Sequence, residues 1–460
     1  MPSAPEAMTA SFRDPNGVVY QRDGVLYRQV NEGHRRNYEH LMGSGLYASL
    51  VDRNLLIPHE EADLGLALSD GAAFVLQPER VSFISYPYEW SWSQLKAAAL
   101  LTLSIQSEAL QHGMTLRDAT AFNVTFHRGT PIFLDTTSLG INEEGQPWVA
   151  YRQFCQHFLA PLALMSHRDV RLSMLLRHHL DGVPLDLAAT LLPARALARP
   201  RLAMHIKLHA GSQRRHADDG EASSSKRFSK RAFEGLIESL RGAIESLPEP
   251  TGASVWRDYY GQADHYSDAA AARKEEIVGA WLDQVRPASV WDLGANTGRF
   301  SHLATEKGLE TVAFDGDPFC VDALYQSGRQ RGDTHLTSLV MDLTNPSPGL
   351  GWAHVERASL LARGPAGAIL ALALIHHLAI AAGVPLPLIT EWFAALAPIA
   401  IIEWVPKHDP MVARLLRDRE DIFTSYTEAS FEEGLSRHFD TLEKEAVGDS
   451  GRSLYLVKRR

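Results

Sequence analysis

Hydrophobic residues in the C-terminal half of the chain fall into short runs that alternate with longer stretches of helical periodicity. Seven such runs are predicted as strands, at residues 289–293, 310–315, 336–342, 366–375, 399–405, 440–447 and 453–459. Strands that alternate with helices favour a doubly wound parallel sheet with helices on both faces. In such sheets ligands bind beyond the carboxyl ends of the strands. We therefore expect an α/β unit whose site residues are those that close each strand.

One apolar stretch is long enough to suggest a membrane span. No Asp, Glu, Lys or Arg occurs between Arg363 and Glu391. The stretch is interrupted by His376 and His377 and by one glycine and two prolines further on. A lipid-facing helix would have to solvate two imidazoles and would lose hydrogen bonds at the prolines. We interpret the stretch as a buried strand, a loop and a helix, and expect no membrane association.

The N-terminal part has a different pattern. Residues 17–30 resemble a hairpin, and helical periodicity follows around residues 93–112 and 150–180. These features predict an α+β domain over residues 1–208.

A polar stretch follows, in which charged residues are mixed with Gly and Ser. We expect residues 209–231 to be a linker or flexible loop. After it, apolar residues at helical spacing predict an amphipathic helix, and we expect this helix to cap the sheet. The residues of this stripe are Phe233, Leu236, Ile237, Leu240, Ile244 and Leu247. The third predicted unit, residues 232–460, thus combines a helical cap with the α/β domain.

Composition narrows the classes of function. The chain has 460 residues, 45% of them hydrophobic and 22% charged, which is typical of a globular protein. A formal net charge of -10 argues against a broad grip on nucleic acid, so a small molecule, or else a protein, is the expected acceptor. The two cysteines, Cys155 and Cys320, suggest neither a disulfide framework nor a metal site. The first residues lack a basic start followed by an apolar run, which predicts a cytoplasmic protein.

The turn after the first predicted strand, "VWDLGANTGRF", has the composition of a nucleotide-like site. Asp292 ends the strand, Gly294 and Gly298 bracket the turn, and Asn296 lies between them. Glycines let a backbone approach a ligand closely, and the start of the next helix offers N–H groups without helical partners. The spacing differs from the three-glycine fingerprint of dinucleotide sites. A carboxylate beside the turn suits a ligand with positive charge.

With these residues, the region from about residue 255 to 460 resembles the class I S-adenosylmethionine-dependent methyltransferases. "DLGANTG" is similar to the first motif of that family, except that the family usually has a further glycine near Asn296. The resemblance implies a Rossmann-like seven-stranded sheet with S-adenosylmethionine as cofactor. It implies transfer of the methyl group to an oxygen or nitrogen nucleophile.

The resemblance also implies roles for acids at the next strand ends. Asp315 matches the residue that binds the ribose hydroxyls, with Asp317 as the alternative, and Asp342 matches the position that contacts the adenine amino group. The competing interpretation of each acid is a helix cap or turn residue. Tyr266, ahead of the sheet, is expected to line the cofactor pocket as part of a lid, or else to pack in the core.

On the acceptor side, the fourth predicted strand runs into His376 and His377. A neutral imidazole can take a proton from an acceptor, and we favour His376 slightly over His377. The alternative is that both only line the pocket. Glu403, near the end of the fifth strand, is a candidate acceptor-site carboxylate or a member of a salt bridge.

A second resemblance lies in the N-terminal domain. Asp118, Asn123 and Asp135 have the spacing of the catalytic loop and metal-binding Asp of kinase-like phosphotransferases. Residues 1–95 contain no lysine, and no glycine-rich phosphate loop is visible. We therefore expect a degenerate kinase-like domain used in recognition or scaffolding. The layout of the two parts also resembles bacterial methyltransferases labelled nodulation-related.

Three functions remain open from the sequence. The leading one is a methyltransferase. The second is a scaffold or substrate-binding protein with a vestigial cofactor site, against which the acids at three strand ends count. The third is a bifunctional phosphotransferase and methyltransferase, against which the missing lysine counts.

Overall fold

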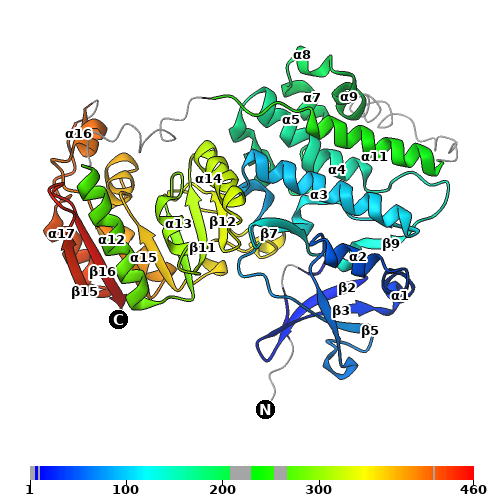
Figure 1. The fold of residues 1–460 in the computed structure, drawn as a ribbon, viewed down its shortest axis with the longest axis horizontal. Coiled ribbons are helices and arrows are strands. Elements are labelled where there is room, and N and C mark those ends of the chain that lie inside the picture. Colours follow the sequence, from blue (N-terminus) through cyan, green and yellow to red (C-terminus); the bar gives the residue numbers. More distant parts are fainter. Residues whose placement is uncertain (1–5, 9–10, 208–228, 253–266, 418–419) are drawn as a thin grey trace. The chain divides into compact units, whose positions relative to one another are not determined.

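The computed structural model describes residues 6–8, 11–207, 229–252, 267–417 and 420–460. These residues divide into two compact units. The first consists of the described residues within 1–252 together with the segment 350–357, and the second of those within 253–349 and 358–460. Each unit is described by itself below. Figure 1 shows the second unit from α12 onward in green to red and the strands that begin the first unit in blue.

The second unit is built on a seven-stranded sheet with the strand order β12-β11-β10-β13-β14-β16-β15. Its strands are β10 (Ser289–Leu293), β11 (Glu310–Asp315), β12 (Leu336–Val340), β13 (Ala368–Ala371), β14 (Ile399–Trp404), β15 (Phe439–Ala446) and β16 (Ser453–Arg459). Neighbours from β12 to β14 are parallel, whereas β16 is antiparallel to both β14 and β15. The seven predicted strands are confirmed. The sheet is mostly parallel, and β16 is the antiparallel exception, because the short connection between β15 and β16 closes a hairpin, which requires antiparallel strands.

Helices connect the strands of this unit. They are α12 (Asp268–Val285), α13 (Arg299–Thr305), α14 (Pro318–Arg331), α15 (Leu386–Leu396), α16 (Pro410–Leu416) and α17 (Glu428–Ser436). The strand and helix predicted within the apolar run are confirmed as β13 and α15. The strand is shorter than predicted, because β13 ends at Ala371 and a turn with Ala373 at φ +51° follows it.

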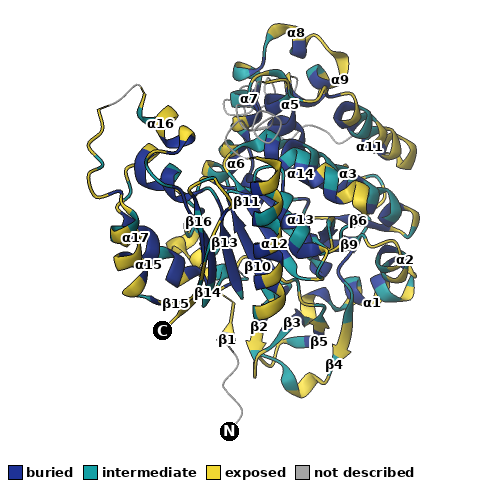
Figure 2. Cartoon of the chain, turned by 60° about the vertical axis from the view of Figure 1, so that its left-hand side comes forward, coloured by how far each residue is buried: buried dark blue, intermediate teal, exposed yellow. Residues whose placement is uncertain are grey.

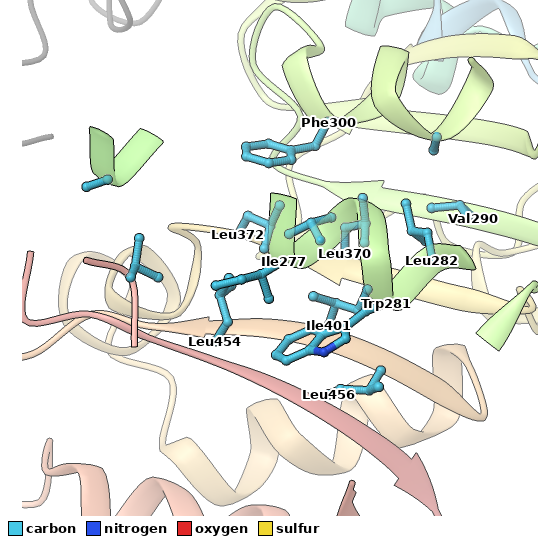
Figure 3. Packing of buried hydrophobic residues seen from close by; sticks show 14 residues of the cluster. Ile277, Trp281, Leu282, Val290, Phe300, Leu370, Leu372, Ile401, Leu454 and Leu456 are labelled. Carbon is cyan, nitrogen blue, oxygen red and sulfur yellow. The ribbon is translucent and has the colours of Figure 1, made fainter. Parts of the chain in front are cut away.

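The main core of the second unit lies between α12 and one face of the sheet. Ile277 and Trp281 of α12 pack with Leu370, Ile401 and other buried residues of the strands (Figure 3). The side chains come from alternate positions of β13, β14 and β16, as expected for one face of a sheet. On the other face, Trp404 stacks on Phe431 of α17 with ring centroids 5.1 Å apart. Figure 2 shows the central strands β10, β13 and β14 as buried, which explains their nearly continuous hydrophobic sequences.

The first unit combines a sheet with a group of helices. The sheet has the order β1-β2-β3-β5-β4 and is antiparallel throughout. Its strands are β1 (Glu6–Ala7), β2 (Gly17–Arg22), β3 (Val25–Asn31), β4 (His59–Ala62) and β5 (Ala72–Pro78). The predicted hairpin at residues 17–30 is confirmed as β2 and β3. Two smaller ladders join β6 (Met114–Leu116) with β9 (Leu139–Ile141) and β7 (Val124–His127) with β8 (Thr130–Phe133).

The predicted helix at residues 93–112 is confirmed as α3 (Trp92–Gln111), which a capping box at Ser91 and Gln94 begins. The region 150–180 is helical but broken into several segments. The helices of this unit are α1 (Arg35–Gly43), α2 (Leu46–Asp52), α3, α4 (Tyr151–Phe154), α5 (Ala160–His167), α6 (Leu175–His178), α7 (Leu185–Leu191), α8 (Ala194–Leu197), α9 (Pro200–Leu202) and α11 (Lys230–Glu245). None of the described helices in either unit combines the length and the apolar character that a membrane crossing requires.

The predicted linker, residues 209–231, lies outside the described residues as far as residue 228. The amphipathic helix predicted after it forms as α11, and its apolar stripe is buried except for the partly exposed Leu236. We expected it to cap the sheet of the second unit. Instead it packs on α3 and α9 and belongs to the first unit. Its stripe, including Phe233 and Leu240, is buried, as predicted. The sequence could not tell whether the sheet of the second unit or the helices of the first unit would cover it, because periodicity specifies a buried face but not what covers it.

Candidate functional site

The turn between β10 and α13 adopts a left-handed backbone at three positions. Gly294, Asn296 and Gly298 have φ values of +77°, +53° and +85°. Asparagine is among the few other residues that adopt this conformation readily. Asn296 therefore reproduces the backbone that a glycine would take at this position. A Cβ at Gly298 would collide with the side chain of Leu324, so this close packing needs glycine.

Asp315, at the end of β11, lies against this turn. One of its carboxylate oxygens accepts a hydrogen bond from the N–H of Asn296 at 2.8 Å, and the other accepts from the N–H of Asp317 at 2.8 Å. Burial raises the pKa of Asp315 to about 6, although both N–H groups favour the ionised form. The alternative residue, Asp317, caps α14 by accepting from the N–H of Phe319 at 2.9 Å. The carboxylate that meets the turn is thus that of Asp315.

Asp292 is the second acid of this region and lies on the face of β10 that α12 and α13 cover. It is buried and accepts a hydrogen bond from the hydroxyl of Ser301 at 2.6 Å. Burial raises the pKa of Asp292 to about 6, and nearby Asp315 adds to this effect. The Ser301 hydroxyl and the ammonium of Lys274 act in the opposite direction. Asp292 is therefore a carboxylate at which added positive charge would be favourable.

A row of buried ion pairs begins at Lys274, whose charge also acts on Asp292. The Nζ of Lys274 lies 2.6 Å from Glu403, whose other oxygen is 3.4 Å from the guanidinium of Arg452. Arg452 also forms two hydrogen bonds with Asp409, at 2.8 and 3.1 Å. Glu403 and the two cations are almost completely shielded from solvent. These contacts favour the salt-bridge interpretation of Glu403, and none of them indicates an acceptor-site role.

Lys274 and Arg452 were not among the residues selected from the sequence. A signal for Lys274 was present, because Ala270, Ile277, Val278 and Trp281 of α12 are spaced three, four or seven residues from it and all are buried. A lysine on such a stripe must either reach solvent or find an anion. No comparable local signal marks Arg452, whose partners are 43 and 49 residues away in sequence.

We had expected the fourth strand to end at His376 and His377, but β13 ends before them. They follow the turn after β13, and His377 begins a π-helical segment, His377–Ala381. Their rings lie side by side with centroids 4.1 Å apart. His376 is fully buried, whereas His377 is partly exposed. Burial, assisted by the charge of Arg452, lowers the pKa of His377 to about 4, so this imidazole is neutral near pH 7.

Two further predicted cofactor residues are Asp342 and Tyr266. Asp342 is exposed just after β12 and accepts hydrogen bonds from the N–H and hydroxyl of Thr344 at 2.9 and 2.6 Å. These bonds match the turn interpretation and leave the proposed adenine contact a prediction. Tyr266 lies outside the described residues.

In the first unit, the structure brings Asp118, Asn123 and Asp135 into one polar cluster. Asn123 donates to the hydroxyl of Ser138 at 3.0 Å, and Ser138 donates to Asp135 at 2.5 Å. Asp118 accepts from the side chain of Gln153 at 2.7 Å. In the part of the chain that the structure describes, no group of three or more His, Cys, Asp and Glu side chains is arranged to hold a metal ion.

The cluster contains a cation that the sequence analysis missed. Arg28 of β3 forms an ion pair with Asp135 and donates to the hydroxyl of Thr137 at 3.1 Å. Burial alone would raise the pKa of Asp135, but Arg28 and the hydroxyls of Ser138 and Thr137 together lower it below its usual value. Arginine carries the same charge as the strand lysine of kinase-like folds and binds carboxylates with more donors.

Comparison with known proteins gives one extensive match and several weak ones. No protein-family model matches the chain. It is 37% identical over 463 residues to nodulation protein NoeA of Rhizobium meliloti (strain 1021), covering 99% of this chain and 96% of that protein.

Among solved structures, magnesium protoporphyrin IX methyltransferase (ChlM) from Synechocystis PCC 6803 with bound SAH is 17% identical, with a TM-score of 0.32 over 44% of this chain and 97% of that chain. WbdD, described as a bifunctional kinase-methyltransferase, is 16% identical, with a TM-score of 0.30 over 47% of this chain and 45% of that chain. Such weak similarity does not determine the ligand of this chain.

Proposed function

We propose that this chain, which belongs to the family of nodulation protein NoeA, transfers the methyl group of S-adenosylmethionine to an oxygen or nitrogen nucleophile of a small-molecule acceptor. The observation that carries the proposal is the contact between Asp315 and the left-handed turn at Asn296. It brings a carboxylate and a tightly packed backbone together at the carboxyl edge of a mostly parallel sheet, where ligands of such folds bind.

The residues present fit this cofactor in charge. Asp315 would accept hydrogen bonds from the ribose hydroxyls, as its ionised carboxylate is an acceptor only. Asp342, at the end of the next strand in the sheet, would meet the adenine amino group. Asp292 would stabilise the cationic part of the ligand, because a buried carboxylate without full neutralisation favours a nearby positive charge. Gly294 would allow the backbone to approach the ligand closely, whereas the space beside Gly298 is filled by Leu324, so Gly298 serves to hold the turn.

When bound, the cofactor supplies a methyl group already activated by its sulfonium. The protein therefore has to align the acceptor nucleophile and, where needed, accept its proton. His377 suits the second task better than His376, because an acceptor can reach a partly exposed ring but not a fully buried one. This reverses the order that we expected from the sequence. Glu403 is omitted from the acceptor site because both its oxygens meet buried cations.

For the first unit we propose recognition or scaffolding, without metal-dependent phosphoryl transfer. Asp135, the candidate metal-binding acid, already meets Arg28, Thr137 and Ser138. A divalent cation would have to displace a guanidinium from a shielded carboxylate. A bifunctional phosphotransferase is disfavoured on this ground, and its test is whether ATP with Mg²⁺ raises the melting temperature.

Isothermal titration with S-adenosylmethionine and S-adenosylhomocysteine tests the main proposal. We expect both to bind with dissociation constants on the order of micromolar, which is the ordinary range for enzyme ligands. Acceptors can then be screened with a labelled methyl donor. Failure of both to bind would contradict the proposal and favour a scaffold with a vestigial site.

A further inference from the structure

The second unit contains a buried ion pair that the proposed reaction does not by itself explain. Lys274 and Glu403 come from α12 and β14, which are 129 residues apart in sequence, and their charged atoms are 2.6 Å apart. The side chain of Lys274 is 6% exposed and that of Glu403 is 0% exposed. Burying two ions costs free energy that their attraction often fails to offset, and apolar residues of similar size are frequently as stable. A role beyond stability is therefore worth seeking.

The position of Lys274 suggests what that role is. Asp292 on β10 and Glu403 on β14 lie on the face of the sheet covered by α12, with β13 between their strands. Lys274 reaches this face from α12, and its charge acts on both carboxylates. Its ammonium also lies 4.8 Å from the ring centroid of Phe300 on α13. The cation is thus held at Glu403, in a place from which its charge also acts on Asp292.

Glu403 in turn is held from its other side. Arg452 approaches its second oxygen at 3.4 Å and is itself bound by Asp409. Charges alternate along this row, from Asp292 through Lys274, Glu403 and Arg452 to Asp409. Glu403 lies between two cations and Arg452 between two carboxylates, and the charge of Lys274 also acts on Asp292.

We propose that Lys274 and Glu403 form a positioning pair, in which Glu403 fixes the Lys274 ammonium beside Asp292 and so keeps Asp292 ionised for the cationic part of the cofactor. The inference rests on the proposed function. Lys274 acts through Asp292, and Glu403 acts through Lys274.

The groups that act on Asp292 come from three elements. Lys274 from α12 and the hydroxyl of Ser301 from α13 favour its ionised form, and Asp315 from β11 disfavours it. Removal of the Lys274 charge leaves Asp315 and burial unopposed except by Ser301. The carboxyl group of Asp292 then holds its proton to higher pH. Cofactor affinity should consequently weaken near neutral pH and recover in alkaline solution.

The experiment compares Lys274→Met with wild type by titration with S-adenosylmethionine across pH. We expect affinity roughly threefold weaker at about pH 6.5, nearly tenfold weaker at about pH 5 and almost unchanged at about pH 8.5, since a one-unit rise in the pKa of Asp292 has its full tenfold effect only below both pKa values. Glu403→Gln should shift the profile in the same direction, because a buried lysine without its anion loses its proton. The matched control is Lys307→Met, which removes an ion pair of the same length with the exposed Asp283 and should leave the profile unchanged.

A second variant covers the case in which Lys274→Met does not fold. Lys274→Met combined with Glu403→Met removes both buried charges together, and such replacements are commonly tolerated. The double variant should fold, and its cofactor affinity should still recover only at a higher pH than that of the wild type. A profile with the wild-type midpoint in either variant overturns the proposal and makes the pair purely structural, as does the same displacement in Lys307→Met.

The carboxyl ¹³C signal of Asp292, assigned with Asp292→Asn in aspartate-labelled protein, separates this inference from the proposed function. Its titration needs no cofactor. We expect its midpoint to rise in Lys274→Met, and an unchanged midpoint overturns the positioning pair. Failure of the wild type to bind the cofactor at any pH would instead sink the proposed function, while the NMR midpoint still decides whether Lys274 governs Asp292.

Discussion

Two shielded carboxylates of the molecule each accept several hydrogen bonds. One is Asp315, at the carboxyl end of β11 in the seven-stranded sheet, and the other is Asp135 in the first unit. Asp315 receives two backbone N–H groups, and burial raises its pKa to about 6. Asp135 receives two hydroxyls and a guanidinium, and its pKa is lowered. Backbone donors leave a carboxylate with unsatisfied negative charge, whereas an arginine neutralises it. The difference distinguishes the acid to which we assign the ribose of the proposed cofactor from an acid whose charge is satisfied internally.

The largest expected effect comes from removing the ligand-facing acid. Asp315→Ala should weaken S-adenosylmethionine binding by roughly a hundredfold, as two charge-assisted hydrogen bonds to the ribose would be lost. Titration calorimetry measures this. The control is Asp317→Ala, which should lower the melting temperature through loss of a cap worth about 1 kcal/mol and leave affinity nearly unchanged. If Asp317→Ala abolishes binding and Asp315→Ala does not, the ribose role belongs to Asp317.

Removing the cation that pairs with Asp135 should reduce the stability of the protein. Arg28→Met leaves Asp135 shielded without its cation and should reduce the free energy of unfolding by about 2 kcal/mol at neutral pH. Because the folded-state pKa of Asp135 is lowered, the stabilisation is fully present above the unfolded value of 3.8 and is lost as pH falls through the folded value. The difference in the free energy of unfolding between wild type and Arg28→Met should therefore become smaller as the pH is lowered.

Urea unfolding at a series of pH values measures the effect of Arg28→Met. Arg53→Met is the matched control, since it breaks a more exposed ion pair with Glu108 and should cost less than about 1 kcal/mol. Equal costs for the two variants would contradict the view that Arg28 neutralises a shielded acid.

Cofactor affinity should depend on pH in the range set by the ligand-facing acids. Asp292 and Asp315 both have a pKa of about 6, and only their ionised forms suit the proposed contacts. Affinity should therefore rise at least about tenfold between about pH 5 and pH 7.5 and then level off. Titrations in buffers of constant ionic strength test this. In Asp315→Asn the remaining rise should be smaller, and a flat wild-type profile would show that neither acid titrates on binding.

The smallest effect is expected at the histidines. His377→Gln should lower kcat by roughly fivefold, less than is usual for a general base, because a pKa of about 4 makes this imidazole a weak one. Cofactor affinity should stay the same. His376→Gln, next to it but fully buried, is the comparison, and it should act mainly on the melting temperature. A larger loss of kcat in His376→Gln would restore the order expected from the sequence.

The sequence by itself determined the local elements of this protein. Seven hydrophobic runs gave seven strands, and the turn with Gly294, Asn296 and Gly298 was recognisable because backbone conformation depends on neighbouring residues. Asp292 and Asp315 could be selected because each closes or nearly closes a predicted strand, and the ribose role of Asp315 came from the resemblance to class I methyltransferases. The helical spacing of α12 even placed Lys274 on the buried face, although its meaning was missed.

Only the tertiary structure decided which charges meet and which side chains are shielded. Lys274 pairs with Glu403 across 129 residues of sequence and Arg28 with Asp135 across 107, and neither pair has a local signature. The difference in burial between His376 and His377, and the assignment of α11 to the first unit, depend in the same way on packing. Periodicity specifies that a face is buried, whereas ion pairing and solvent access depend on what long-range contacts bring against it.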